Sequence, residues 1–318
     1  MKSASKMHEP RVVIRYSLFA DSPFADLRIC GFADLLISAR SMSFRAAAIL
    51  RPGVTGRVLA SFERVCDLVT DAGAVVALVW SGIGNGPLNV VHGGRPGAAL
   101  RVGARFAVRD RCFAIGAVTF DLARAELWDA RPDWDVLRAR RAQVVAVAHA
   151  ARSSSSGLQS GSLLKQAGPA VEAAVAAFGE AWQRGVRDEL VAVARGLCGL
   201  GPGLTPAGDD WLAGWLLAQH LAEDLRGLRP TAGWYDLEGL IDDITADRTT
   251  ALSRAFLQCA AAGEADESWH VLLSALAEKP MVNLPILQST DAILAHGATS
   301  GAAMLAGFFA GMEMPDPC

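Results

Sequence analysis

The sequence lacks an excess of charge of either sign. Its 30 Lys and Arg residues nearly balance its 33 Asp and Glu residues, which gives a formal net charge of −3. Proteins that bind nucleic acid or an anionic membrane surface usually carry a clear excess of basic residues. The composition gives no electrostatic support for such partners, and we expect neither nucleic acid nor a membrane to be bound.

Paired cysteines are also missing. The six cysteines are scattered without a C-x-x-C pair, and the six histidines never fall at metal-ligand spacing from one another or from a cysteine. This pattern is typical of reduced, mostly buried thiols rather than of a disulfide framework or a zinc centre. We therefore expect a cytoplasmic protein without a cysteine–histidine metal site.

Long apolar runs are absent as well. The stretch from Ala74 to Trp80 is among the longest, and it is far shorter than the about 20 residues that a membrane helix needs. The first residues are polar, and no apolar core of signal-peptide length follows them. These features predict a soluble protein.

The chain does contain enough apolar residues for a large core. It has 318 residues, 52% of them hydrophobic, which is enough for about two domains. Short strand patterns separated by turns fill residues 1–130, whereas almost everything in residues 131–318 has the periodicity of helices. We predict an α+β fold, in which a β-rich, barrel-like N-terminal domain precedes an all-helical domain and the functional site lies at their interface.

Within these domains, three segments receive specific predictions. Residues 44–50 have the composition of a strand, and Asp133 begins a long helix that continues to about Ala151. Residues 152–162 are rich in serine and glycine, which predicts a flexible break: either a plain linker or a loop that orders over a site.

The most informative stretch is residues 199–210, GLGPGLTPAGDD. Its glycines permit positive φ angles and close backbone approach, while Thr205 and Pro206 are typical of a helix N-cap and first helical position. A glycine-rich turn that enters a helix collects unpaired N–H groups at the positive end of the helix dipole, an arrangement that binds phosphate or carboxylate. The predicted anion contacts are Gly201, Gly203, Leu204, Thr205 and Gly208.

Asp209 and Asp210 complicate this prediction, because carboxylates in the first turn repel an anion unless a cation lies between them. The two side chains could hold Mg²⁺, which in turn holds a phosphate, and both are candidate catalytic residues. Alternatively, one carboxylate accepts N–H groups and caps the turn. A third interpretation is a purely structural turn with both aspartates solvated.

Three other segments carry candidate site residues. Asn85 and Asn89 in a second glycine-rich segment could point at a ligand, or could occupy the turn positions of a hairpin. Arg248 and Thr249, just before a predicted helix, could clamp a phosphate or carboxylate, although an ordinary cap with a surface arginine explains them equally well.

The third of these segments surrounds the start of the last predicted helix. His296 could act as a general acid or donate to an anion, or it could be a structural donor. Thr299 and Ser300 are candidate N-caps of this helix, and their N–H groups are further candidate contacts of a ligand.

Together, four segments resemble one family in the right order and over about residues 40–310. It is the family that includes the AllH subunit of oxamate carbamoyltransferase. The longest of the four motifs is the most specific, and they read GNGPLN at 84–89, GPGLTPAGDD at 201–210, TTALS at 249–253 and HGATSG at 296–301.

The resemblance implies a cytoplasmic protein of purine-derived (allantoin) nitrogen metabolism that works with FdrA-like and AllG-like subunits. Such a complex interconverts oxalurate plus phosphate with oxamate plus carbamoyl phosphate. These ligands are small and anionic, in agreement with the anion-binding turn. The sequence lacks the Ser-Thr-Arg-Thr phosphate loop of aspartate and ornithine carbamoyltransferases, so their mechanism is not carried over.

The combined hypothesis is a carbamoyltransferase subunit whose backbone N–H groups at residues 201–208 and 299–300 bind the anion. In it, Asp209 or Asp210 positions Mg²⁺, Arg248 neutralises charge, and the two asparagines reach over from the β-rich domain. Positioning and stabilisation of a developing oxyanion would be the main catalytic contributions. The alternatives are a non-catalytic subunit that binds a small anion or phosphorylated metabolite within a larger complex, and a scaffold whose glycine turns are structural.

Overall fold

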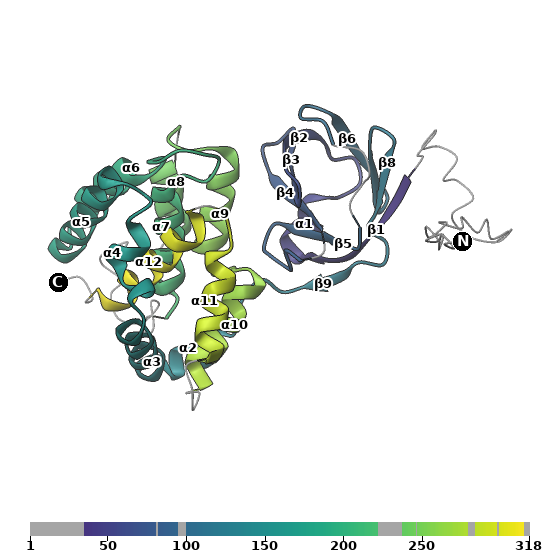
Figure 1. Ribbon diagram of the computed structural model, residues 1–318. Coiled ribbons are helices and arrows are strands. Elements are labelled where there is room, and N and C mark those ends of the chain that lie inside the picture. The colour runs from purple at the N-terminus through teal and green to yellow at the C-terminus, as the bar shows by residue number, and fades with distance from the viewer. Residues whose placement is uncertain are drawn as a thin grey trace, which may run out of the picture.

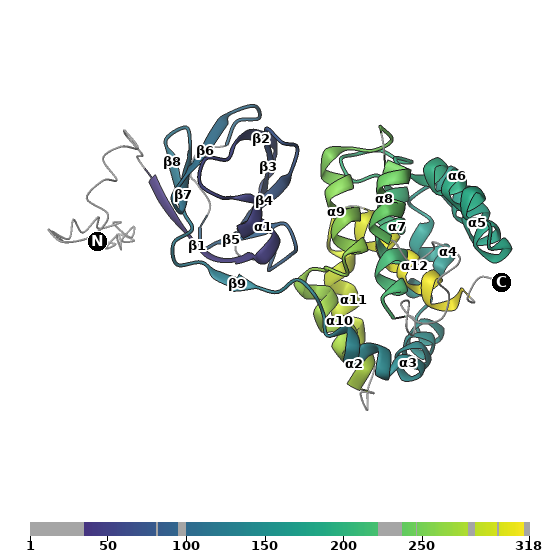
Figure 2. The same cartoon turned by 180° about the vertical axis from the view of Figure 1, so that it is seen from behind.

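The computed structural model describes residues 35–80, 82–94, 100–221, 237–245, 247–278, 284–297 and 299–314. An N-terminal β-barrel lies beside a C-terminal helical region, and Figures 1 and 2 show the two parts from opposite sides. The predicted α+β fold with a barrel-like first domain is therefore confirmed. None of the helices in the described ranges has the length and apolar character needed to cross a membrane.

The barrel contains eight strands in the order β5-β4-β3-β2-β6-β7-β8-β1, and a pairing between β1 and β5 closes it. A ninth strand, β9, pairs in parallel with the end of β1. The strands are β1 (Leu35–Ser43), β2 (Thr55–Ser61), β3 (Val65–Thr70), β4 (Val75–Trp80), β5 (Asn89–His92), β6 (Arg105–Arg109), β7 (Cys112–Ile115), β8 (Val118–Asp121) and β9 (Glu126–Trp128).

Closure depends on the length of β1, which has 9 residues. Its first part pairs in parallel with β8, from Leu35 opposite Val118. Its second part pairs antiparallel with β5, from Ala39 opposite His92, and a register shift follows Ala39. One long strand can therefore bridge the two edges of the sheet, which leaves no open edge between β5 and β8.

Residues 44–49 form a helix, so the prediction of a strand at residues 44–50 is wrong. α1 (Phe44–Ile49) begins at Ser43, whose side-chain oxygen accepts the N–H of Ala46 at 2.9 Å. This N-cap, followed by three consecutive alanines, favours a helical turn over an extended segment. The Ser43 hydroxyl also donates to the carbonyl of Pro87 at 2.5 Å, which fixes α1 against the loop before β5.

Helices make up the regular structure of the described residues after β9. They are α2 (Trp134–Ala139), α3 (Arg141–Ser154), α4 (Ser160–Leu164), α5 (Pro169–Arg184), α6 (Arg187–Leu197), α7 (Ala207–Gln219), α8 (Leu237–Thr245), α9 (Ala251–Ala261), α10 (Glu267–Glu278), α11 (Leu284–Leu294) and α12 (Ser300–Glu313).

Two segments of the helical region differ from the expectation. The predicted long helix is divided at Arg140 into α2 and α3, although its start is capped as predicted, by the Asp133 carboxylate. The predicted flexible break at residues 152–162 contains the end of α3, a 3₁₀ turn at Ser156–Leu158 and part of α4. Burial of Leu158 in the helical core explains why this serine-rich segment adopts regular structure.

Helix α7 forms the centre of the helical core, and each of its residues is buried. It packs directly against α12, because a glycine in each helix lets the two backbones touch. A Cβ atom added at Gly214 would lie 1.9 Å from the carbonyl oxygen of Met304, and one added at Gly307 would lie 1.9 Å from that of Trp211. This contact holds the first turn of α7 beside the first turn of α12.

Both apolar and polar contacts join the barrel to the helical region, whose helices α9 and α10 lie on the side that faces the barrel (Figures 1 and 2). Val75 and Leu88 of the barrel pack in one cluster with Leu252 of α9. An ion pair connects Arg45 of α1 to Glu264 at 2.5 Å. The two parts are therefore docked on each other, and any space between them has walls of defined geometry.

We predict that Gly214→Ala lowers the free energy of unfolding by about 1–3 kcal/mol or more, because the added methyl group collides with a backbone carbonyl. Gly196→Ala in α6 is the matched control, since a Cβ there meets nothing within 4 Å. It should leave stability unchanged or raise it by up to about 1 kcal/mol. Denaturant unfolding of both variants measures this difference, and equal effects would contradict the close packing of α7 on α12.

Candidate anion-binding site

The first turns of α7, α9 and α12 meet at one place. The hydroxyls of Thr205 and Ser300 lie 3.0 Å apart and join the turn before α7 to the start of α12. The Thr250 hydroxyl donates to the carbonyl of Leu204 at 2.6 Å and joins the same turn to the start of α9. Because each helix start carries a partial positive charge, the three dipoles add at this point.

Thr205 does not cap α7, so that part of the prediction is wrong. Helix α7 begins at Ala207 with Pro206 in the N-cap position, and no side chain caps it. The hydroxyl of Thr205 is directed to Ser300 instead. At the start of α12, Thr299 occupies the predicted N-cap position, but its side chain makes no capping hydrogen bond.

The glycines of the turn have two different roles. Gly199 and Gly208 allow close packing, since a Cβ would lie 2.0 Å from the carbonyl oxygen of Arg248 in the first case and 2.1 Å from that of Leu197 in the second. Gly203 has a φ of +99° and would meet nothing within 4 Å, so its surroundings are open. The glycine-rich turn is therefore packed at its ends and accessible at its centre.

Several backbone N–H groups of the turn make no hydrogen bond within the described part of the chain, which leaves them available to a ligand. Gly208 is not among them, because its N–H donates to the carbonyl of Leu200 at 2.9 Å. The N–H groups of four residues make no hydrogen bond to any residue that the structure describes: Gly201, Gly203, Leu204 and Thr205. These four donors lie on an accessible loop, as an anion-binding turn requires.

Asp209 is buried and its carboxylate is fully used within the protein. One oxygen accepts the N–H of Gly199 at 2.8 Å. The other accepts the hydroxyls of Ser253, at 2.8 Å, and of Thr249. This carboxylate therefore ties the glycine-rich turn to the start of α9, which corresponds to the capping alternative left open by the sequence.

Asp210 has fewer hydrogen-bond partners than Asp209. Its side chain is 7% exposed, and its Oδ2 atom has no hydrogen-bond partner within the described part of the chain. Burial raises the pKa of Asp210, a hydrogen bond with Ser300 opposes the shift and the nearby Asp209 adds to it, with a net pKa of about 8. At neutral pH this carboxyl group is largely protonated, so it does not repel an anion and can donate a proton.

The Mg²⁺ predicted at Asp209 and Asp210 remains a prediction. In the described ranges, no group of three or more His, Cys, Asp or Glu side chains is placed to hold a metal ion. The oxygens of Asp209 are taken by three protein donors. Of the two predicted ligands, only Asp210 offers an oxygen without a partner.

Arg248 lies beside the site but faces another element. Its guanidinium donates two hydrogen bonds, of 3.2 and 3.1 Å, to the carbonyl of Arg195 in the last turn of α6. This interaction stabilises the negative end of that helix. Thr249, the next residue, contacts Asp209 directly, so the predicted Arg–Thr pair contributes a hydroxyl to the site and a cap to α6.

His296 reaches the site through its backbone. Its carbonyl accepts the N–H of Gly301 in the first turn of α12 at 3.1 Å. Its side chain points elsewhere, with Nδ1 3.5 Å from a carboxylate oxygen of Asp266, the residue before α10. The predicted role of the imidazole as a general acid is therefore not supported by a contact with the three helix starts.

Asn85 and Asn89 hold their own loop on α10. The Asn85 amide oxygen accepts the Ser41 hydroxyl at 2.6 Å, and its backbone N–H donates to Glu267 at 2.9 Å. The Asn89 amide donates to the carbonyl of Gly84 at 3.1 Å. Within the described residues, neither amide makes a hydrogen bond to the starts of α7, α9 or α12; Asn85 contacts Glu267 of α10, and Asn89 bonds within its own loop.

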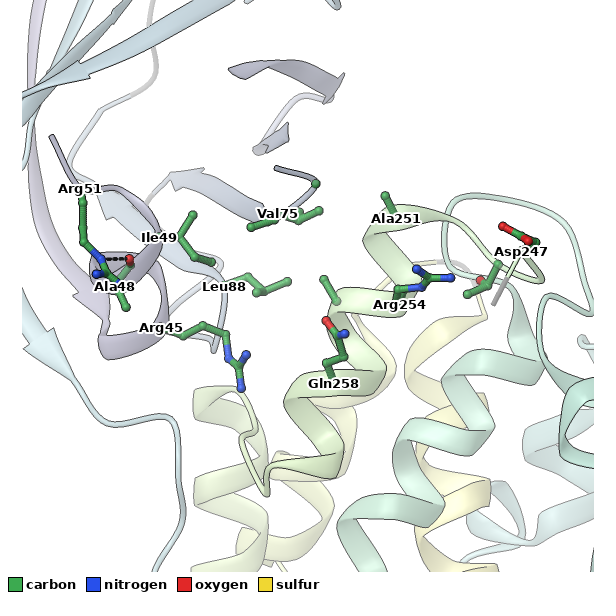
Figure 3. A pocket seen from close by; sticks show the side chains of 14 residues that line it. Arg45, Ala48, Ile49, Arg51, Val75, Leu88, Asp247, Ala251, Arg254 and Gln258 are labelled. Atoms are coloured by element: carbon green, nitrogen blue, oxygen red, sulfur yellow. Dashed lines mark hydrogen bonds between the residues drawn. The ribbon is translucent and has the colours of Figure 1, made fainter. Parts of the chain in front are cut away.

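The sequence-based prediction did not include a cavity of about 590 Å³ between α1 and α9 (Figure 3). Arg45 and Arg51 line it from the barrel side, whereas Arg254 and Gln258 line it from α9. Thr249 belongs to its wall and also contacts Asp209. Arg45 was missed because residues 44–50 were assigned to a strand, and Arg51 lies just after that segment and after the end of α1.

Comparison with known proteins gives one family. Residues 197–312 match the model of the family described as oxamate carbamoyltransferase subunit AllH. The resemblance inferred from the motifs is confirmed for this part of the chain, which contains the glycine-rich turn and all three helix starts. The motif at 84–89 lies outside the match. No solved structure matches the chain with statistical significance.

Two neighbouring carboxylates give a pH-dependent prediction. The folded-state pKa of Asp210 is about 8, above its ordinary value of 3.8. Its protonation therefore contributes stability that is complete below pH 3.8 and is lost as the pH rises through about 8. Asp210→Asn should remove this dependence. As the pH rises from 3.8 to about 8, the free energy of unfolding of the variant relative to that of the wild type should increase by a few kcal/mol.

Asp209→Asn is the control, because it replaces an acceptor of three hydrogen bonds with an amide. It should lower the free energy of unfolding by about 1–3 kcal/mol at every pH in this range. Denaturant titrations at several pH values separate the two patterns. A difference between wild type and Asp210→Asn that stays constant with pH would contradict a protonated Asp210.

Proposed function

We propose that this protein is an AllH-like subunit of an oxamate-type carbamoyltransferase, and that the meeting point of α7, α9 and α12 binds its anionic substrate. The observation that carries the proposal is the contact between Thr205 and Ser300, which brings two helix starts together inside the matched region. Carbamoyl phosphate, phosphate, oxalurate and oxamate are all small anions suited to such a site. We infer a cytoplasmic complex in which FdrA-like and AllG-like subunits are the partners.

The proposed reaction joins phosphate to the carbamoyl group of oxalurate. A phosphate oxygen forms a bond to the carbamoyl carbon, the bond from that carbon to the oxamate nitrogen breaks, and the proton lost by phosphate is balanced by one gained by that nitrogen. Negative charge develops on the carbamoyl oxygen during this exchange. Free N–H groups of the turn are the kind of donors that stabilise such charge.

We assign the proton transfer in this scheme to Asp210. Its carboxyl group is buried and lies in the first turn of α7, and its Oδ2 has no partner among the residues that the structure describes. A pKa of about 8 lets it give a proton to a leaving nitrogen and recover one near neutral pH. Asp209 is given no chemical step, since its hydrogen bonds hold the site together.

A non-catalytic anion-binding subunit is the second candidate. It is favoured by the saturation of Asp209 and by the contacts of Arg248 with Arg195 and of His296 with Asp266, which leave few groups to perform chemistry. In that case the chain holds a substrate or product for a centre formed by partner subunits. Both candidates require an anion at the same turn, so binding and turnover have to be measured separately.

We predict that Leu204→Asp weakens the binding of inorganic phosphate and carbamoyl phosphate by at least about tenfold, because the new charge faces the anion. The Leu204 side chain is 38% exposed, so the substitution does not disturb a core. Leu204→Asn has nearly the same shape without the charge and should bind almost as the wild type does. Calorimetric titration with and without Mg²⁺ measures both variants, and equal affinities would exclude an anion at this turn.

Turnover separates the two candidates. If the chain is catalytic, phosphorolysis of oxalurate in the assembled complex falls by at least about 100-fold in Asp210→Asn while the affinity for phosphate is retained. If it only binds an anion, Asp210→Asn keeps its activity and Leu204→Asp raises the KM for phosphate. Full activity of the complex with Leu204→Asp would contradict both roles.

A further inference from the structure

The cavity between the barrel and the helical region has the size of a small-molecule site. Its volume of about 590 Å³ lies in the range of 300–1,000 Å³ typical of ligand pockets. One wall is α1 of the barrel and the other is α9 of the helical region, with Val75 and Leu88 between them (Figure 3). The site therefore exists only because the two parts are docked together.

Its polar lining favours an anion. Three guanidinium groups line the cavity, together with the single carboxylate of Asp247. Arg45 is paired with Glu264, and Arg254 donates to the carbonyl of Thr245 at 2.8 Å. These bonds still leave each arginine with further N–H donors, since a guanidinium carries five.

Arg51 is as little engaged as Arg254, since each donates a hydrogen bond to one backbone carbonyl. The Nε of Arg51, which follows α1, donates to the carbonyl of Ala48 in α1 at 2.6 Å, and Arg51 forms no ion pair with any residue in the described ranges. Figure 3 shows this bond on the α1 wall. An unpaired guanidinium at the edge of a cavity is suited to bind a carboxylate or phosphate in bidentate fashion.

The rest of the lining is apolar and favours a ligand with a hydrocarbon body. Ile49, Val75 and Leu88 contribute this surface on the barrel side, and Ala251 and Ala255 contribute it on α9. A bare inorganic anion would leave most of this surface and volume unused. Both the size and the chemistry therefore indicate a larger molecule than carbamoyl phosphate.

We propose that the cleft between α1 and α9 binds an organic oxyanion, with its carboxylate or phosphate on Arg45 and Arg51 and its apolar body on Ile49, Val75 and Leu88. This site is separate from the anion-binding turn and does not rest on the proposed function. Thr249 lines the cleft and contacts Asp209, so one residue lies between the two sites. A ligand in the cleft is thereby placed next to the turn.

Three related probes test the proposal by ligand-detected NMR titration of the full chain. 3-Phenylpropionate and phenyl phosphate carry the two kinds of oxyanion on a flat apolar body, whereas 3-phenylpropan-1-ol is the neutral analogue. At least one anion should bind at least about fivefold more tightly than the alcohol. Which of the two binds better distinguishes a carboxylate ligand from a phosphate ligand.

Two variants and one control locate the binding. Arg51→Gln should weaken the preferred anion by about tenfold and leave the alcohol unchanged. Ala251→Trp adds bulk at an exposed lining position and should weaken all three probes. Arg109→Gln removes one exposed charge from β6 of the barrel, away from this lining, and should bind like the wild type.

The proposal is overturned if no probe binds at up to about 10 mM, if the alcohol binds as tightly as both anions, or if neither variant changes the affinity. Leu204→Asp should keep the binding of the phenyl anions while it loses that of inorganic phosphate. A failure in the cleft is therefore distinguishable from a failure at the anion-binding turn.

Discussion

The buried carboxylate of Asp209 is the interaction on which the functional region depends. It accepts a backbone N–H from the glycine-rich turn and hydroxyls from Thr249 and Ser253, so a single side chain fixes the start of α7 to the start of α9. Without it, the positive ends of two helices would lie close together with no compensating negative charge. Because Asp209 lies in the first turn of α7, its carboxylate supplies that charge.

Asp210 shows how two adjacent carboxyl groups can have opposite states. Asp209 has three donors, whereas Asp210 has an oxygen without a partner in the described part of the chain and a pKa of about 8. Burial without enough donors favours the neutral acid. The region therefore uses Asp209 for structure and has a neutral carboxyl group at Asp210, so an anion at the turn meets N–H donors beside a neutral acid.

The glycine contacts between α7 and α12, and the docking of the barrel on α9, position the other parts of the functional region. Close contact of α7 with α12 at Gly214 and Gly307 sets the position of the third helix start relative to the first. On the other side, α9 packs on Val75 of the barrel and completes the cleft lined by Arg45 and Arg51. Helix α9 is thus shared: its start belongs to the anion-binding turn, and its side belongs to the wall of the cleft.

The sequence by itself determined the local features: the strand pattern that became β4, the helical second half, and a glycine-rich turn whose motif agrees with the match over residues 197–312. These features depend on neighbouring residues and on the period of the apolar positions, which a sequence displays directly. Residues 44–50 were mistaken for a strand because a short run of alanine and arginine has no clear period. The cap at Ser43 decided their conformation.

Only the tertiary structure decided which of the candidate residues meet. Thr205 and Ser300 are 95 residues apart in the chain, and their contact arises from the packing of α7 on α12. The protonation of Asp210, the direction of Arg248 toward α6 and the existence of the cleft likewise depend on burial and on partners from distant segments. Such properties belong to the assembled core, because desolvation and long-range contacts have no local signature in the chain.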